Sequence, residues 1–301
     1  MLRIWAGKLP LLLAVITLGG GCQSQNKVSF DGDRAYQYLL TQCDFGPRHP
    51  GSDGHQKMLE FLKSELEKHS DKVKLQNFKA ENPASSDSLN LTNVLVSFYP
   101  EMERRVLLCA HWDTRPWADR DSDSSKHNLP IIGANDGASG VAVLLHLAEL
   151  IARHKPQYGV DLVFFDGEDL GQEGRPETYA LGSQYFAKAS TGYRPEFAIL
   201  LDMVGDKDLK IYPEEYSARY APHTVGLIWS KAKELKLDCL VDSVGPAVYD
   251  DHVPLLQAGI PCANLIDFVY PYWHTTRDTP DKCSARSLEN VGRLVAALLY
   301  D

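Results

Sequence analysis

The sequence predicts an α/β fold: a single three-layer α/β/α domain with a central mixed, mostly parallel β-sheet. Apolar runs typical of strands alternate along the chain with amphipathic helical segments, which is the pattern of a parallel sheet covered by helices on both faces. No linker or internal repeat interrupts this pattern. Of the 301 residues, 44% are hydrophobic and 24% are charged, which is ordinary for a globular protein. We therefore expect one domain spanning residues 30–301.

The first 22 residues have the features of an export signal. Two basic residues occur within residues 1–8, an apolar run covers residues 9–18, and three glycines follow. A basic region, a short apolar region and small residues at a cleavage site make up a signal peptide. The apolar run is too short to span a bilayer as a helix. We therefore expect segment 1–22 to be a signal and the mature chain to be exported.

Cys22 follows the small residues directly, as the lipidated cysteine does in a bacterial lipoprotein signal. Gly19 departs from that signal, which usually has leucine at this position. We expect a periplasmic or outer-membrane-anchored lipoprotein with a lipid anchor at Cys22 and a polar tether at residues 23–29. Plain secretion is the alternative.

The first half of the domain begins with helices and continues into strands. Residues 55–69 place Met58, Leu62 and Leu66 on one face of a helix. Residues 105–110 are nearly all apolar, which is typical of a central strand buried on both faces. The same reasoning predicts helices at 30–43, 55–69 and 137–154, strands at 72–78, 91–98 and 105–110, a Gly/Pro-rich loop at 45–54 and a polar loop at 112–129.

The second half of the domain repeats the alternation of strand and helix. An apolar run at 160–166 ends abruptly in Asp166-Gly167, a dipeptide that marks a turn. Helical periodicity and further apolar runs follow it. In chain order they predict a strand at 160–166, a loop at 171–178, a helix at 179–189, a strand at 197–203, helices at 218–235 and 251–258, a strand at 262–266 and a closing helix at 287–300.

Charge and cysteine content exclude several classes of function. The net charge is -9 and no basic run occurs, which argues against a protein that binds nucleic acid or an anionic membrane surface. Five cysteines remain after Cys22, without close spacing, so neither a disulfide framework nor a CxxC metal motif is present. One disulfide is compatible with this count. Cys109 and Cys262 lie in apolar runs, and we expect both to be buried thiols.

Histidine and carboxylate residues recur where predicted strands end or predicted helices begin. Ligands in α/β folds bind in the crevice at the carboxyl ends of the strands. Each such residue alone is typical of a turn, a helix cap or a solvated loop, but their repeated placement favours a metal site. Histidine and carboxylates without cysteine suit a catalytic Zn²⁺ with an open position. The candidates are His111, Asp113, Asp136, Glu168, Asp169, Asp202 and His274.

Five motifs, in order and spacing, resemble the zinc aminopeptidase family with a co-catalytic metal pair. They are His111-Trp112-Asp113, the Gly-rich turn 133–140, Phe165 to Asp169, Leu201-Asp202-Met203 and His274-Thr275. The resemblance covers essentially the whole mature chain and implies a zinc aminopeptidase-like domain. Asp169 departs from the family pattern, which usually has glutamate there. No HExxH, GxSxG or Walker-type loop competes with this assignment.

Two features resemble the glutaminyl cyclases within this family. Trp273 directly precedes His274, and residues 250–255 read Asp-Asp-His-Val-Pro-Leu. The resemblance implies that Zn²⁺, one ion per chain, is held by Asp136, Asp169 and His274. It also implies a general base and acid at Glu168, a carboxylate pair of Asp202 and Asp251 beside the substrate, and a substrate pocket lined by Trp273 and covered by Trp112 or Trp117.

The implied reaction is zinc-dependent cyclisation of an N-terminal glutamine to pyroglutamate with release of ammonia. The partners would be peptides or proteins with N-terminal glutamine and no nucleic acid, and we expect a monomer. The alternative is a two-zinc aminopeptidase, since His111 and Asp202 complete a second set of metal ligands. A third hypothesis is a binding lipoprotein that keeps the fold without catalysis.

Overall fold

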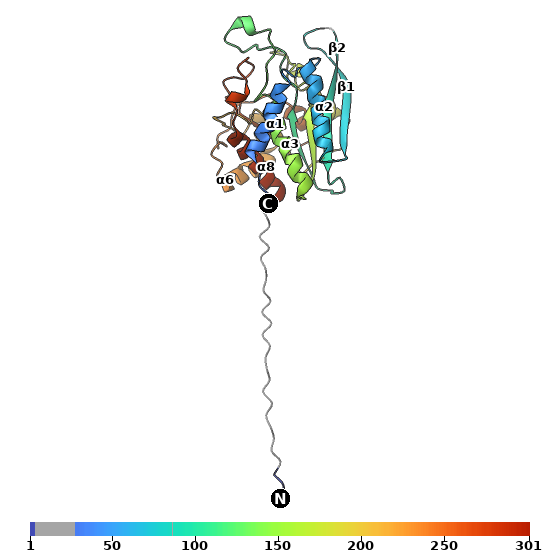
Figure 1. The fold of residues 1–301 in the computed structure, drawn as a ribbon, viewed down its shortest axis with the longest axis vertical. Helices are drawn as coiled ribbons and strands as arrows, with labels where there is room; N and C mark the ends of the chain where they lie inside the picture. The colour runs from blue at the N-terminus through green and yellow to red at the C-terminus, as the bar shows by residue number, and fades with distance from the viewer. Residues whose placement is uncertain (4–27, 86) are drawn as a thin grey trace.

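The computed structural model describes residues 1–3, 28–85 and 87–301 (Figure 1). The predicted signal, apart from its first three residues, lies outside the described residues, as do Cys22 and most of the tether at 23–29. Among the residues described, no helix is both long and apolar enough to cross a membrane.

A six-stranded mixed sheet forms the centre of the described domain. The neighbouring strands β4, β3, β5 and β6 run parallel, and β1 and β2 add two antiparallel pairings at one edge. The predicted mixed, mostly parallel sheet is therefore confirmed. In spatial order the strands are β1 (Val73–Glu81), β2 (Ser88–Phe98), β4 (Gly159–Phe165), β3 (Arg105–His111), β5 (Ala198–Asp202) and β6 (Cys262–Ile266).

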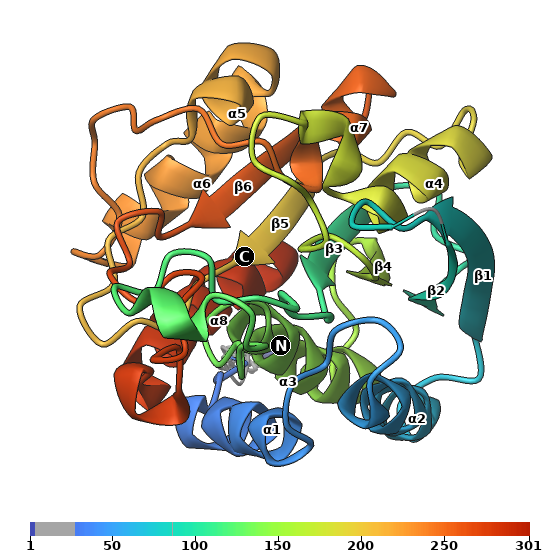
Figure 2. The same cartoon turned by 90° about the horizontal axis from the view of Figure 1, so that it is seen from above.

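Helices cover both faces of the sheet, which completes the three layers (Figure 2). One face carries α1 (Gly32–Asp44), α2 (Asp53–Glu67), α3 (Ala138–Arg153), α6 (Pro222–Glu234) and α8 (Ala285–Tyr300). The other face carries α4 (Leu181–Ala189), α5 (Glu215–Tyr220) and α7 (His252–Gln257). Single 3₁₀ turns occur at Ser124–Lys126, Pro176–Thr178 and Pro280–Lys282.

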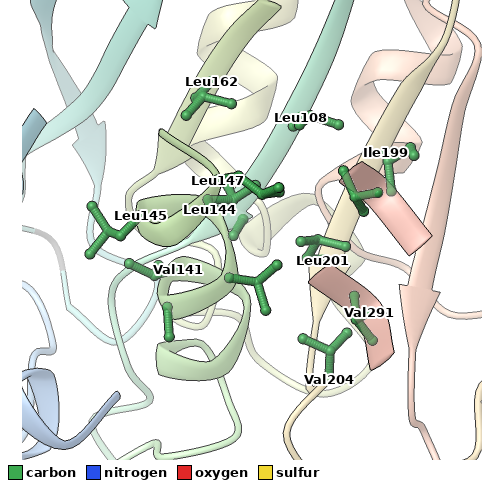
Figure 3. Packing of buried hydrophobic residues seen from close by; sticks show 14 of the residues in the cluster. Leu108, Val141, Leu144, Leu145, Leu147, Leu162, Ile199, Leu201, Val204 and Val291 are labelled. Atoms are coloured by element: carbon green, nitrogen blue, oxygen red, sulfur yellow. The ribbon is translucent and has the colours of Figure 1, made fainter. Parts of the chain in front are cut away.

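Alternation along the strands supplies a core to each face. Leu108 packs toward α3, whereas its neighbours Leu107 and Cys109 face α4 and α7, because successive strand residues point to opposite sides. Figure 3 shows part of the larger core, to which the strands contribute residues such as Ile199 and α3 contributes residues such as Val141. Cys109 and Cys262 are both fully buried, as predicted. The five cysteines at positions 43, 109, 239, 262 and 283 are all free thiols.

The predicted single helix at 218–235 is wrong. The structure has two helices there, because α5 ends at Tyr220 and α6 begins at Pro222. Proline has no N–H to donate and disfavours the helical conformation at the residue before it. Ala221 accordingly has φ of -130° and ψ of 48°, which is not helical. The break turns α5 into a separate short helix on the opposite face of the sheet from α6.

Candidate metal and catalytic site

The predicted site residues converge at the carboxyl ends of the parallel strands. His111 is the last residue of β3 and Asp202 the last of β5. Glu168 and Asp169 lie in the turn after β4, and Asp136 lies just before α3. All of these side chains are buried, as is His274 in the loop after β6. The structure thus brings together residues that lie up to 163 positions apart, from 111 to 274.

Asp136, Asp169 and His274 form one group suited to a metal ion. Nε2 of His274 lies 3.0 Å from Oδ1 of Asp169 and 3.6 Å from Oδ2 of Asp136. Oδ2 of Asp136 and Oδ2 of Asp169 are buried without a hydrogen-bond partner in the described structure. Buried carboxylate oxygens are normally paired, so these two orphaned atoms indicate a missing cation. Carboxylate oxygens and imidazole nitrogens both bind zinc, and catalytic zinc sites have three protein ligands with a fourth position open.

His111, Asp136 and Asp202 form a second group that shares Asp136 with the first. Nε2 of His111 lies 3.1 Å from an oxygen of each carboxylate. Burial lowers the pKa of His111, but the carboxylates of Asp113, Asp136 and Asp202 together raise it well above its usual value. These carboxylates therefore favour the protonated imidazole, and the same side chains could instead hold a metal ion.

Two further aspartates hold the backbone of the site in place. The Asp113 carboxylate accepts the N–H groups of Glu168 (3.1 Å) and Asp169 (3.2 Å). The Asp278 carboxylate accepts the N–H of Asp136 (3.1 Å) and that of the preceding residue (2.9 Å). The sequence placed Asp113 in the cluster but did not indicate this role. It gave no signal for Asp278 beyond its nearness to His274.

The loop at 112–129 contributes a buried cation and a carboxylate to the site. Arg115 Nη1 donates to the backbone oxygen of Asp169 at 3.0 Å and lies 3.4 Å from its Oδ1. Asp119 lies 3.5 Å from Nδ1 of His274, on the side of the ring away from the metal group. Burial lowers the pKa of His274, but Asp169 and Asp119 raise it to about 8. A carboxylate behind a ligating histidine fixes the orientation of the ring.

Backbone geometry at the site explains the Gly-rich turn before α3. A Cβ atom on Gly137 would lie 2.6 Å from Cε1 of His111, closer than any side chain permits. Met203, directly after Asp202, and His274 both have positive φ, at 46° and 54°. Non-glycine residues in this conformation carry strain and cluster at functional sites. The backbone around the site is thus closely packed and constrained, and it fixes the positions of His111, Asp202 and His274.

Glu168 lines a pocket together with Asp136, Asp169 and His274, the three residues of the first metal group. Aromatic residues form the walls, and Trp273 stands with its ring centroid 5.0 Å from that of Phe268. Burial, reinforced by the negative charge of Asp250, raises the pKa of Glu168 well above its usual value. The lining residues include Asp136, Glu168, Asp169, Tyr179, Asp202, Tyr249, Asp250, Phe268, Trp273 and His274.

The carboxylate that faces Asp202 is Asp250, which corrects the expected pairing with Asp251. Asp250 lines the pocket, and burial followed by the charge of Asp202 raises its pKa to about 6. Asn264 donates to Asp250 at 2.6 Å and orients it. Asp251 is fully buried and does not line the pocket. Adjacent residues at the start of α7 point in different directions, so only one of the pair can reach the site.

Neither Trp112 nor Trp117 lines the pocket. Trp112 is completely buried, stacks on His55 with ring centroids 4.3 Å apart, and donates its indole N–H to the backbone oxygen of Thr92 at 3.2 Å. It is a core residue, and its expected place over the substrate is wrong. Trp117 lies over the guanidinium of Arg115, 5.1 Å from the ring centroid, beside the site. Tyr179 and Tyr249 line the pocket together with Trp273, in the role that was expected for Trp112 or Trp117.

Comparison with known proteins agrees with this geometry. Peptidase family M28 matches residues 93–299. Tannerella forsythia glutaminyl cyclase is 39% identical with a TM-score of 0.87, covering 91% of this chain and 99% of that one. Bacteroides thetaiotaomicron glutaminyl cyclase, bound to N-acetylhistamine, is 37% identical with a TM-score of 0.88, covering 92% and 99%. A leucine aminopeptidase precursor from the same organism is 38% identical with a TM-score of 0.87, covering 92% and 99%.

The fold and the buried histidine–carboxylate groups define an enzyme of the metallopeptidase type. The chain belongs to peptidase family M28, within which it is similar to glutaminyl cyclases over nearly its whole folded length.

Proposed function

We propose that this chain converts the N-terminal glutamine of peptides and proteins to pyroglutamate and releases ammonia, with zinc as its cofactor. The observation that carries the proposal is that Asp202, Asp250 and Glu168 line one pocket together with Trp273. Cyclisation of glutamine moves protons between an amine and an amide nitrogen, and carboxyl groups lining the pocket can accept and donate those protons. The similarity to glutaminyl cyclases supports the same reaction.

One zinc ion held by Asp136, Asp169 and His274 would act as a Lewis acid toward the γ-carbonyl oxygen of the substrate. The orphaned oxygens of Asp136 and Asp169 supply the negative charge that such an ion requires. Arg115 would orient Asp169, and Asp119 would orient His274, from the sides of these ligands that point away from the ion. We propose a single zinc per chain, since Nε2 of His111 already lies 3.1 Å from an oxygen of Asp136 and from an oxygen of Asp202.

Glu168 moves the proton in this mechanism. The α-amine of the substrate forms a bond to the γ-carbon of its own side chain, and the bond from that carbon to the amide nitrogen breaks. Glu168 accepts the proton lost by the attacking nitrogen and returns it to the departing nitrogen, which leaves as ammonia. Its raised pKa favours holding the proton between the two steps. Because the attack is intramolecular, its entropic cost is small.

The Asp202–Asp250 pair binds nitrogen rather than transferring the main proton. Burial and the charge of Asp202 raise the pKa of Asp250 to about 6, and two close carboxyl groups seldom both ionise, so Asp250 can offer a donor as well as an acceptor. Asn264 and the N–H of Asp251 hold Asp250 in position by donating to its two oxygens. Such a pair can accept a hydrogen bond from the attacking or departing nitrogen as that nitrogen becomes tetrahedral.

A two-zinc aminopeptidase is the second candidate. The ligand set His111, Asp136 and Asp202 and the similarity to a leucine aminopeptidase precursor favour it. Incubation with a glutamine-initiated peptide separates the two. Cyclisation lowers the mass of the intact peptide by one ammonia, whereas an aminopeptidase releases free glutamine. A chain that does neither would be a binding protein.

We further propose that the chain is exported and anchored through Cys22. The apolar run at 9–18 and the small residues before Cys22 support this localisation. In fractionated cells, Cys22→Ser should move the protein from the membrane to the soluble fraction. An unchanged distribution would contradict the lipid anchor.

A further inference from the structure

A second apolar cavity lies next to the catalytic pocket, between α5 and α7. These two short helices pack against each other on the same face of the sheet (Figure 2). The cavity has a volume of about 430 Å³ and is open to solvent. Aromatic and aliphatic side chains dominate its lining, which consists of Tyr216, Tyr220, Tyr249, Val253, Leu256 and Gln257.

The spacing of these residues along the helices builds the groove. Tyr216 and Tyr220 are four residues apart, and therefore lie on one face of α5. Val253 and Leu256 are three residues apart and lie on one face of α7. Tyr220 remains 57% exposed and lies beside the other apolar side chains that line the cavity. The two helices thus present facing apolar walls that no residue in the described part of the chain covers.

Tyr249 connects the groove to the catalytic pocket. Its side chain lines both cavities, and the residue directly precedes Asp250. A substrate whose N-terminal residue lies against Glu168 must lead the rest of its chain out of the pocket. An extended peptide advances about 3.3–3.6 Å per residue, so its next few residues can reach the groove beyond Tyr249.

One buried carboxylate holds both walls in place. Glu214 accepts hydrogen bonds from the N–H of Tyr216 (2.9 Å) and the N–H of Val248 (3.0 Å), the residue before Tyr249. It also lies 2.9 Å from Nε2 of His252, the first residue of α7. Because the walls are pinned before any ligand arrives, binding costs little ordering of the protein.

We propose that the groove between α5 and α7 binds the residues that follow the N-terminal glutamine, and that it selects peptides with a large apolar or aromatic side chain within the first few of those positions. This inference rests on the proposed cyclisation. Flat, rigid tyrosine rings supply contact area at low entropic cost, as they do in other peptide-binding surfaces. Complete burial of one large apolar side chain corresponds to roughly a tenfold or greater gain in binding.

The test compares substrates that differ only beyond the first residue. The zinc-loaded full chain is assayed with glutaminyl-glycine amide and with glutamine-initiated pentapeptides that carry one Phe or one Ser at the second, third or fourth position. The wild type should show a kcat/KM about tenfold higher for Phe than for Ser at one of these positions. Tyr220→Ser should reduce that ratio to near one, with at most a twofold change on glutaminyl-glycine amide.

Leu256→Ala, on the opposite wall, should reduce the same ratio. The matched control is Tyr185→Ser, because Tyr185 is also exposed, at 39%, but stacks on Phe78 of β1 at the far edge of the sheet. That variant should keep the wild-type ratio.

Failure of the wild-type chain to cyclise even glutaminyl-glycine amide would refute the proposed function itself.

Three results would overturn the groove assignment alone. The first is a wild-type ratio near one at every position, and the second is an unchanged ratio in both groove variants. The third is a change from dimer to monomer in Tyr220→Ser by light scattering, which would show that a second copy of the chain occupies the groove.

Discussion

Nε2 of His111 lies 3.1 Å from Oδ1 of Asp202, and both side chains are buried at the ends of neighbouring parallel strands. This contact decides how the two overlapping ligand groups are used. If His111 carries a proton, it satisfies Asp202 without a metal ion, and the zinc site is confined to the other group. If a second zinc displaces that proton, the same residues make a two-metal centre.

Metal stoichiometry distinguishes these two states. We expect one tightly bound zinc per chain, which His274→Ala removes and His111→Gln retains. The measurement is elemental analysis of purified protein after dialysis against a weak chelator. Two zinc ions in the wild type, one of them lost in His111→Gln, would instead indicate the aminopeptidase type of centre.

Glu168→Gln should abolish turnover while zinc stays bound. The variant keeps the shape of the side chain but cannot carry the proton, and loss of a general base typically lowers kcat by about 10²–10⁴-fold. Kinetics on a glutaminyl peptide and zinc analysis of the same sample test this. Asp169→Asn is the comparison, and it should lose zinc. Zinc loss in Glu168→Gln would mean that the roles of the two adjacent residues are reversed.

Asp250→Asn and Asp251→Asn form a matched pair at neighbouring positions. We expect Asp250→Asn to lower kcat by about 10²-fold, because the pocket loses a carboxyl group that can accept a hydrogen bond from the substrate nitrogen. Asp251 does not line the pocket, and burial raises the pKa of its carboxyl group well above the usual value, which favours the neutral form that an amide resembles. Asp251→Asn should therefore stay within a few-fold of wild type. Equal losses in both variants would contradict the assignment.

Trp112 and Trp273 should respond differently to substitution. Trp112→Phe leaves the backbone oxygen of Thr92 without its buried donor, at a cost of about 1–3 kcal/mol in the free energy of unfolding, with KM unchanged. Trp273→Ala removes a wall of the pocket and should raise KM about tenfold with little effect on thermal stability. Denaturant unfolding and steady-state kinetics on both variants measure the contrast. A raised KM in Trp112→Phe would contradict the assignment of Trp112 to the core and would indicate that it contacts the substrate.

Glu214 should make stability depend on pH. Burial raises its pKa, but the hydrogen bond and charge of His252 and the backbone donors lower it to about 2, below the ordinary value of 4.5. The depressed pKa means that its contribution is complete above about pH 4.5 and is lost as the pH falls toward 2. Glu214→Gln should therefore cost about 2 kcal/mol at pH 7 and less at pH 3, by urea unfolding. A constant difference across this range would contradict the ionised Glu214.

The sequence alone was sufficient for the positions of the strands along the chain and for the residue types of the site. Strand ends can be recognised because a run of apolar residues stops at a turn, and His111, Glu168 and Asp202 all lie at such points. Their residue types are enough to indicate a hard-to-borderline metal ion. Pro222 was also visible in the sequence, and its effect on the helix at 218–235 could have been anticipated from its missing N–H.

The tertiary structure decided which of two similar residues occupies each functional position. Asp250 and Asp251 are chemically identical, and only the direction of the chain entering α7 turns the first toward Asp202. Trp112 has an apolar ring and an N–H donor, so its residue type suits a buried core as well as a substrate pocket. Its stacking on His55 and its hydrogen bond to Thr92, which only the structure shows, place it in the core. Supporting contacts such as Asp113 with Glu168 join distant segments, and local sequence patterns carry no information about such pairs.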